Sequence, residues 1–135
     1  MTVEEGVWRI GDAAFFGCTN LESVAFPDSL TSIRPCAFGD CVRLRRVWCG
    51  TGLAEVGQAA FGGCKNLQNI YFNGDAPKQL GTRILVRTPA TLVNHVRSGA
   101  KGWGVRWPAN DDFSRPVAVV EPQALTNLWK ETLRR

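Results

Sequence analysis

The chain has 135 residues, of which 44% are hydrophobic and 21% charged, and it carries a net charge of +4. This length suffices for one domain with a sizeable core, and the five Trp, seven Phe and one Tyr exclude a wholly disordered chain. No apolar run reaches the about 18 residues that a membrane span needs. The acidic start, with Glu4 and Glu5, lacks the apolar region of a secretory signal, so we expect neither feature.

From its beginning the chain follows a repeat with a period of 23 residues. One such repeat cannot bury its apolar face alone, but stacked repeats bury a continuous core. Each repeated position is therefore predicted to form a ladder of buried side chains. The positions that share this step are Val7, Leu30 and Leu53; Ile10, Ile33 and Val56; Ala14, Ala37 and Ala60; Phe15, Phe38 and Phe61; Cys18, Cys41 and Cys64; Leu21, Leu44 and Leu67; and Val24, Val47 and Ile70.

Each repeat contains one predicted strand and one predicted helical turn. The segment from Leu21 to Phe26 alternates at its end as a half-buried strand does, and the turn residues Pro27-Asp-Ser29 follow it. The alanine-rich segment 11–17 ends in Gly17 and is predicted to form one or two helical turns. One short strand and one helical turn per repeat is the leucine-rich-repeat arrangement, so the expected fold is an α/β repeat solenoid.

The motif Ala-Phe-x-x-Cys-x-x-Leu, as it stands within residues 10–33, is the signature of BspA-like leucine-rich repeats, which the segment 7–77 resembles. The resemblance continues in residues 88–91 and 99–104, which are similar to the closing segment of such arrays. It implies a short right-handed leucine-rich-repeat array of about three 23-residue units over residues 1–77. It also implies a role in adhesion, recognition or scaffolding, which the fold alone does not separate.

Residues 78–120, rich in Trp, Gly and Pro, are expected to form an irregular C-terminal closing segment, because solenoid arrays need capped ends. The period places Ile84 on the Phe ladder. Strand side chains alternate faces, so a slip by one residue changes which of them point inward. Two registers remain open: Val93 and His95 inward, or, after a slip, Leu92 and Val96 inward.

The two ends of the chain differ. Residues 121–135 are predicted to form an amphipathic C-terminal helix, with Pro122 in the first turn. Its apolar face either docks on the last repeat or is offered to a partner. At the other end no strand of an earlier repeat is visible, so either residues 1–9 form an improvised cap or an apolar end is left for a neighbour. The apolar helix face consists of Leu125, Leu128, Trp129 and Leu133.

The cysteines and the single histidine indicate neither a metal site nor catalysis. No Cys-x-x-Cys pair is present, and His95 is far from the cysteines in sequence. Parallel side chains in a ladder do not suit disulfide geometry, and the odd number of cysteines, five, favours free thiols and a reducing intracellular compartment. Cys36 and Cys49 lie outside the ladder and have no assigned role. Without a nucleophile elbow or a phosphate-binding glycine loop, we expect no enzyme, cofactor or metal.

The candidate binding residues are the strand positions between the core residues, which face the concave surface of a leucine-rich repeat. Stacking is expected to align Ala25 with Trp48 and Tyr71, and Ser23 with Arg46 and Asn69. Exposed Trp, Tyr and Arg side chains that lie close together are typical of interface hot spots; in the alternative, Trp48 and Tyr71 only pack across strands. The predicted partner-binding residues are Arg45, Arg46, Trp48, Asn69, Tyr71, Leu128 and Trp129.

The charge is unevenly distributed along the chain. Residues 78–135 hold ten Lys/Arg and four Asp/Glu, whereas residues 1–77 hold six and eight. The basic half either meets an acidic partner or is a solvated surface, and nucleic-acid binding is a lesser alternative because no recognised motif supports it. The sequence therefore predicts a non-enzymatic protein-interaction module that binds a protein partner through its repeat face. The alternative is a structural subunit of a larger assembly, joined through its bare N-terminal end and its C-terminal helix.

Overall fold

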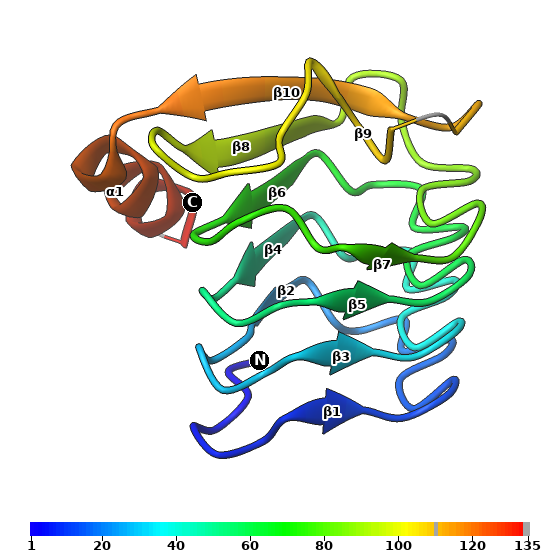
Figure 1. Ribbon diagram of the computed structural model, residues 1–135. Coiled ribbons are helices and arrows are strands. Elements are labelled where there is room, and N and C mark those ends of the chain that lie inside the picture. Colours follow the sequence, from blue (N-terminus) through cyan, green and yellow to red (C-terminus); the bar gives the residue numbers. More distant parts are fainter. Residues whose placement is uncertain (110, 134–135) are drawn as a thin grey trace.

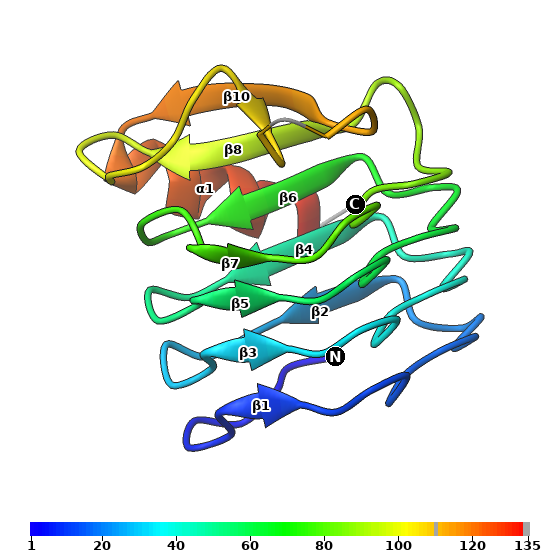
Figure 2. The ribbon, with the colours of Figure 1, turned by 45° about the vertical axis from the view of Figure 1, so that its right-hand side comes forward.

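The computed structural model describes residues 1–109 and 111–133, and the side chains of 1–109 and 111–130. Within them the chain winds as a β-solenoid whose successive coils contribute to two sheets, in which all strand pairs are parallel except the antiparallel pair of β9 and β10 (Figure 1). The large sheet has the order β2 (Ser23–Ala25), β4 (Arg46–Cys49), β6 (Asn69–Phe72), β8 (Val93–Arg97), β10 (Arg115–Val120) and β9 (Arg106–Trp107). The small sheet has the order β1 (Arg9–Ile10), β3 (Ser32–Ile33), β5 (Glu55–Val56) and β7 (Gln79–Leu80). Figure 2 shows the two sheets as opposite walls of the coil.

The predicted helical turn in each repeat is wrong, because the described repeats contain no helix. The segment 11–17 forms turns, and a second short strand, such as β1, directly precedes this segment in each coil. Ala13 has a left-handed φ of 52° and Gly17 one of 71°, which no helix accommodates. Between them the N–H of Phe15 donates to Ala37 O of the next coil at 2.8 Å. Donors to the next coil thus alternate with donors to local carbonyls three residues back, as at Phe16, whose N–H donates to Ala13 O. The same two left-handed positions recur at Cys36 and Asp40, Ala59 and Gly63, and Arg83 and Arg87.

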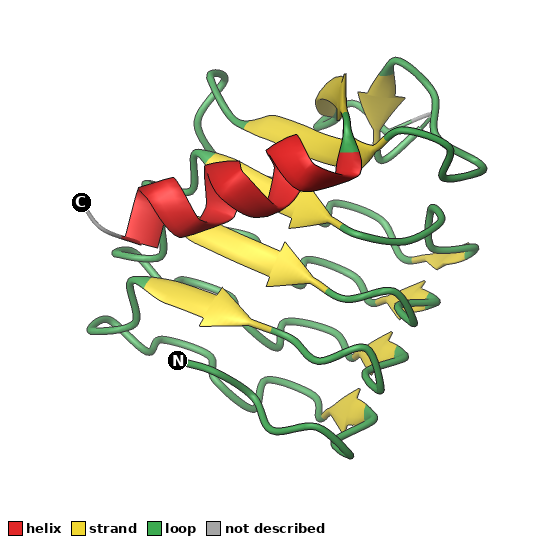
Figure 3. Ribbon diagram, turned by 90° about the vertical axis from the view of Figure 1, so that its left-hand side faces the viewer, coloured by secondary structure: helices red, strands yellow, loops and turns green. Residues whose placement is uncertain are grey.

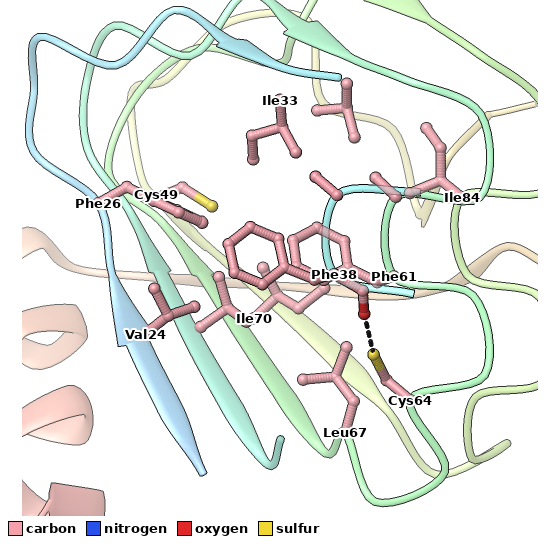
Figure 4. Packing of buried hydrophobic residues seen from close by; sticks show 14 of the residues in the cluster. Val24, Phe26, Ile33, Phe38, Cys49, Phe61, Cys64, Leu67, Ile70 and Ile84 are labelled. Carbon is pink, nitrogen blue, oxygen red and sulfur yellow. Dashed lines mark hydrogen bonds between the residues drawn. The ribbon is translucent and has the colours of Figure 1, made fainter. Parts of the chain in front are cut away.

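The predicted Phe ladder forms the centre of the core. Phe38 is fully buried and stacks between Phe15, at a ring-centroid distance of 5.2 Å, and Phe61, at 5.6 Å. Figure 4 shows the rings of Phe38 and Phe61. The Cys ladder runs beside it, and the Cys64 thiol donates to Phe38 O at 3.1 Å. This bond is the dashed line of Figure 4, and the Cys41 thiol makes the equivalent bond to Phe15 O at 3.2 Å. Identical side chains one coil apart therefore hold the stack together, as the period predicts.

All five cysteines are free thiols, but they differ in burial. Cys41 and Cys64 are buried, whereas Cys18 is only half-buried because it lies on the first rung, where no coil covers it from below. Cys49, without a role in the sequence, is fully buried in the core, and this burial raises the pKa of its thiol. Cys36 is half-buried at a left-handed turn position.

The register left open by the sequence is resolved in favour of the slip. Tyr71 pairs with His95 and Ile70 with Asn94, so the step between β6 and β8 is 24 residues. Leu92 and Val96 accordingly point into the core, and both are buried. The slip also corrects the position of Ile84. Phe61 N donates to Ile84 O as Phe38 N donates to Ala60 O, so Ile84 continues the Ala ladder and Leu85 the Phe ladder.

The 24-residue step between β6 and β8 places the polar residue Asn94 in the ladder of Val47 and Ile70. It is fully buried, and its side-chain amide donates to the carbonyls of Trp107 and Arg115, both at 3.3 Å. These bonds join β8 to β9 and β10. Trp103 and Trp107 cover Phe72, at centroid distances of 4.6 and 5.0 Å. Residues 78–120 are therefore less irregular than predicted, because they include the strands β7, β8, β9 and β10.

The N-terminal end continues the large sheet, contrary to the expectation that no earlier strand is present. Thr2 forms a parallel bridge with Ala25, and Val3 N donates to Ala25 O at 2.9 Å. Residues 1–3 are thus one period below Val24, Ala25 and Phe26. The sequence signal is weak because residues 1–3 carry none of the repeated Ala, Phe, Cys and Leu positions.

The single described helix, α1 (Pro122–Leu133), follows β10 and confirms the predicted C-terminal helix. Only Glu121 separates the two elements. Figure 3 shows α1 lying obliquely across the strands of the large sheet. The helix therefore covers the face of this sheet that points away from the core.

Candidate functional site

Residues of the large sheet alternate between the core and the face that α1 crosses, here termed the outer face. Val47 and Ile70 point inward and are fully buried. Trp48 pairs with Tyr71 and Arg46 with Asn69, as the sequence predicts. Because parallel strands align paired residues, each pair belongs to a column that runs along the solenoid. The two columns are Thr2, Ala25, Trp48, Tyr71, His95 and Ala118, and Ser23, Arg46, Asn69 and Val93.

Three rings of the first column, Trp48, Tyr71 and His95, form what we call the aromatic row. Tyr71 stacks on His95 at a centroid distance of 4.7 Å and on Trp48 at 6.4 Å. The His95 ring nitrogen Nε2 is 2.8 Å from the Asn69 side-chain oxygen, and burial lowers the pKa of His95. Sequence reasoning missed His95 because the insertion before β7 moves it from the predicted core column to the outer face.

The helix α1 completes this aromatic cluster with a side chain from the far end of the chain. The Trp129 ring lies 5.9 Å from that of Trp48 and 5.7 Å from that of Tyr71. Tyr71 is 2% exposed although it points away from the core, and Leu125 of the helix is fully buried. The outer face and the apolar helix face therefore cover each other. Leu128 is 38% exposed at the margin, and the Leu133 side chain lies outside the described residues.

A groove of about 470 Å³ remains open beside the helix. Residues 2–5, which include Glu4 and Glu5, line the groove together with Trp48, Thr126 and Trp129 of the outer face and α1. The remaining lining residues are Ala25, Phe26 and Pro27. The small side chains of the first column, Thr2 and Ala25, leave this space where the aromatic row ends. One edge of Trp48 thus faces solvent while the other is covered.

The predicted arginines differ in their surroundings. Arg45 is exposed, and its guanidinium is 3.9 Å from the Glu22 carboxylate, a contact open to solvent. Arg46 is half-buried, and burial together with the nearby charge of Arg45 lowers its pKa. Among the described residues no acceptor lies within hydrogen-bond distance of its buried Nε. Arg46 is therefore a predicted binding residue that carries a buried donor without an acceptor among the described residues.

The repeat motif identifies the family. A sequence model of the BspA-type leucine-rich repeat region, spanning six copies, matches residues 1–93. The chain belongs to the BspA-type leucine-rich repeat family. Neither the curated proteins nor the solved structures include a match to it. Leucine-rich repeats serve in general as protein-interaction modules, and repeat solenoids of this family are typically non-enzymatic.

The described part of this BspA-type array contains no group of three or more His, Cys, Asp or Glu side chains placed to hold a metal ion. No described helix is long and apolar enough to cross a bilayer. The outer face presents the stacked rings of the aromatic row, with the half-buried Arg46 in the column beside it.

Proposed function

We propose that this chain is a non-enzymatic protein-interaction module that binds a protein partner through the outer face of the large sheet. The observation that carries the proposal is the aromatic row, with Arg46 and Asn69 in the column beside it. Rigid aromatic side chains offer a large contact area at a low cost in conformational entropy. Trp, Tyr and Arg are also the residues most often found at the energetic centres of interfaces.

The partner first contacts the part of the face that α1 leaves accessible. Trp48 is half-buried and lines the open groove, so a partner side chain that enters the groove packs against its free edge. A partner that uncovers Arg46 Nε and supplies a carboxylate or carbonyl satisfies a buried donor that has no acceptor among the described residues. Leaving such a donor unsatisfied costs about 1–3 kcal/mol, so this contact favours the complex.

A specific observation also supports the second candidate, a structural subunit of a larger assembly. Trp8 is 59% and Phe16 54% exposed, and both lie on the first coil, at the end of the array opposite the closing segment. Large apolar side chains exposed together mark interaction sites. A subunit joined through this end would bury both rings against a neighbour and would leave the outer face to α1.

Affinity capture from the source cells, with the full chain as bait, separates the two candidates. The wild type is compared with Trp48→Ala, with Trp8→Ala/Phe16→Ala, and with Lys130→Ala as the control, because Lys130 is exposed on α1. We expect Trp48→Ala alone to lose the partner, and capture at high salt to be reduced if Arg46 takes part. Loss with the Trp8→Ala/Phe16→Ala bait alone would favour the structural subunit and rule out the outer face.

A further inference from the structure

The outer face already holds a ligand, which is the chain's own helix. Two side chains one helical turn apart, Leu125 and Trp129, make the contact. Leu125 is fully buried, and the Trp129 ring lies against both Trp48 and Tyr71. Residues at i and i+4 lie on the same side of a helix. The geometry of α1 therefore defines what this face accepts: a helix that presents a leucine and an aromatic ring at this spacing.

Tertiary contacts rather than intrinsic propensity hold α1 in place. The helix has twelve residues, and isolated helices shorter than about 12–15 residues are marginal in water. Thr126 and Asn127, both poor helix formers, lie between the two anchors. Leu128 stays partly exposed at the margin. The contacts of Leu125 and Trp129 therefore hold α1, and the single linking residue Glu121 supports them because it keeps α1 at a high effective concentration near the face.

We propose that α1 is an intramolecular substitute for a partner helix. The protein partner carries an amphipathic helix with a leucine and an aromatic residue at positions i and i+4, and this helix replaces α1 on the outer face. This inference rests on the proposed function and names the class of partner. An acidic residue beside the aromatic anchor suits the partner, since α1 leaves Arg46 Nε without an acceptor among the described residues.

Competition by α1 has a measurable consequence. A face that is mostly covered binds an external helix with an affinity lowered by the fraction of time it is open. Weakening α1 without changing the face must therefore tighten the binding of an external helix. A substitution that removes a contact residue of the outer face must weaken the binding of an external helix, whether or not α1 is intact.

The experiment uses the full chain and a fluorescein-labelled synthetic peptide of residues 121–133. Three host proteins are titrated by fluorescence polarisation: the wild type, Trp129→Ala, which removes the anchor, and Asn127→Pro, which breaks the helix at an exposed position. The matched controls are a Trp129→Ala peptide and the Trp48→Ala/Trp129→Ala host. Circular dichroism and size-exclusion chromatography with light scattering check the folding and mass of each host.

We expect both weakened hosts to bind the peptide about tenfold more tightly than the wild type, or better. The control peptide and the host without Trp48 should bind at least tenfold more weakly than their parents, as for loss of a hot spot. The inference is overturned if the weakened hosts bind no more tightly than the wild type, if the loss of Trp48 has no effect, or if the hosts dimerise through their own helices. If the peptide binds as expected while the captured partner is indifferent to Trp48→Ala, the proposed function is wrong and the helix site stands.

Discussion

Replacing Phe38 by alanine tests the ladder on which the fold depends. Its ring is fully buried, stacks on Phe15 and Phe61, and meets the edge of Phe26 at a centroid distance of 5.5 Å. A buried Phe→Ala change costs about 3–5 kcal/mol, and each aromatic pair adds about 0.5–1.5 kcal/mol. The loss should therefore lie at the upper end, about 5 kcal/mol. This is a third or more of the about 5–15 kcal/mol that stabilises a typical domain.

Urea unfolding followed by tryptophan fluorescence measures this loss. With an m-value of about 2 kcal/mol/M, the midpoint should fall by about 2.5 M. Phe16→Ala is the matched control, since its ring follows Phe15 in sequence but is largely exposed, and it should change the free energy of unfolding by less than about 0.5 kcal/mol. A Phe38→Ala protein with the wild-type midpoint, or a control that loses as much, would refute the stacking.

Three further predictions follow from burial and hydrogen bonding. A thiol reagent should label Cys36 in the native state but Cys49 only after unfolding, because burial raises the pKa of Cys49 and blocks access; labelling at equal rates, seen by peptide mass spectrometry, would contradict this. Burial lowers the pKa of His95 from 6.5, so the folded state should lose stability as the pH falls below about 6.5. A His95→Gln variant should show a flatter profile of urea midpoint against pH between about 7 and 5, and an unchanged slope would count against the buried ring. Asp111→Ala removes the carboxylate that accepts Arg83 N–H at 2.9 Å and should lower the free energy of unfolding by about 1 kcal/mol. An unfolding temperature equal to that of the wild type would show that this hydrogen bond contributes nothing to stability.

The sequence predicts the ladders well because the period alone determines them. Phe38, Cys41 and Leu44 recur one period later as Phe61, Cys64 and Leu67, and each of the six is buried. The same step aligns Trp48 with Tyr71 on the outer face. Period and alternation therefore suffice for the core and for most of the candidate site, since stacked coils repeat every contact.

The rest depends on features that a period does not encode. The insertion before β7 moves His95 to the outer face and Asn94 into the core, and a single added residue leaves no signal in the composition. The alanine-rich segment 11–17 suggests a helix, but Ala13 adopts a left-handed conformation that a helix does not allow. Hydrogen bonds to the next coil outweigh the helix propensity of the alanines. The contact of Trp129 with Trp48 joins segments far apart in the chain. No local pattern predicts where a terminal helix will dock.

The most direct test of the account measures the affinity of the captured partner for the wild type and three variants of the chain by isothermal titration calorimetry. Trp48→Ala should weaken binding by about 2 kcal/mol, which is about thirtyfold in affinity. Trp129→Ala should instead tighten binding, because it releases the helix that competes for the same face, and Lys130→Ala should match the wild type. The account is contradicted if Trp48→Ala binds as the wild type does while Trp129→Ala abolishes binding without unfolding the array. In that case the helix, and not the outer face, is the surface that the partner recognises.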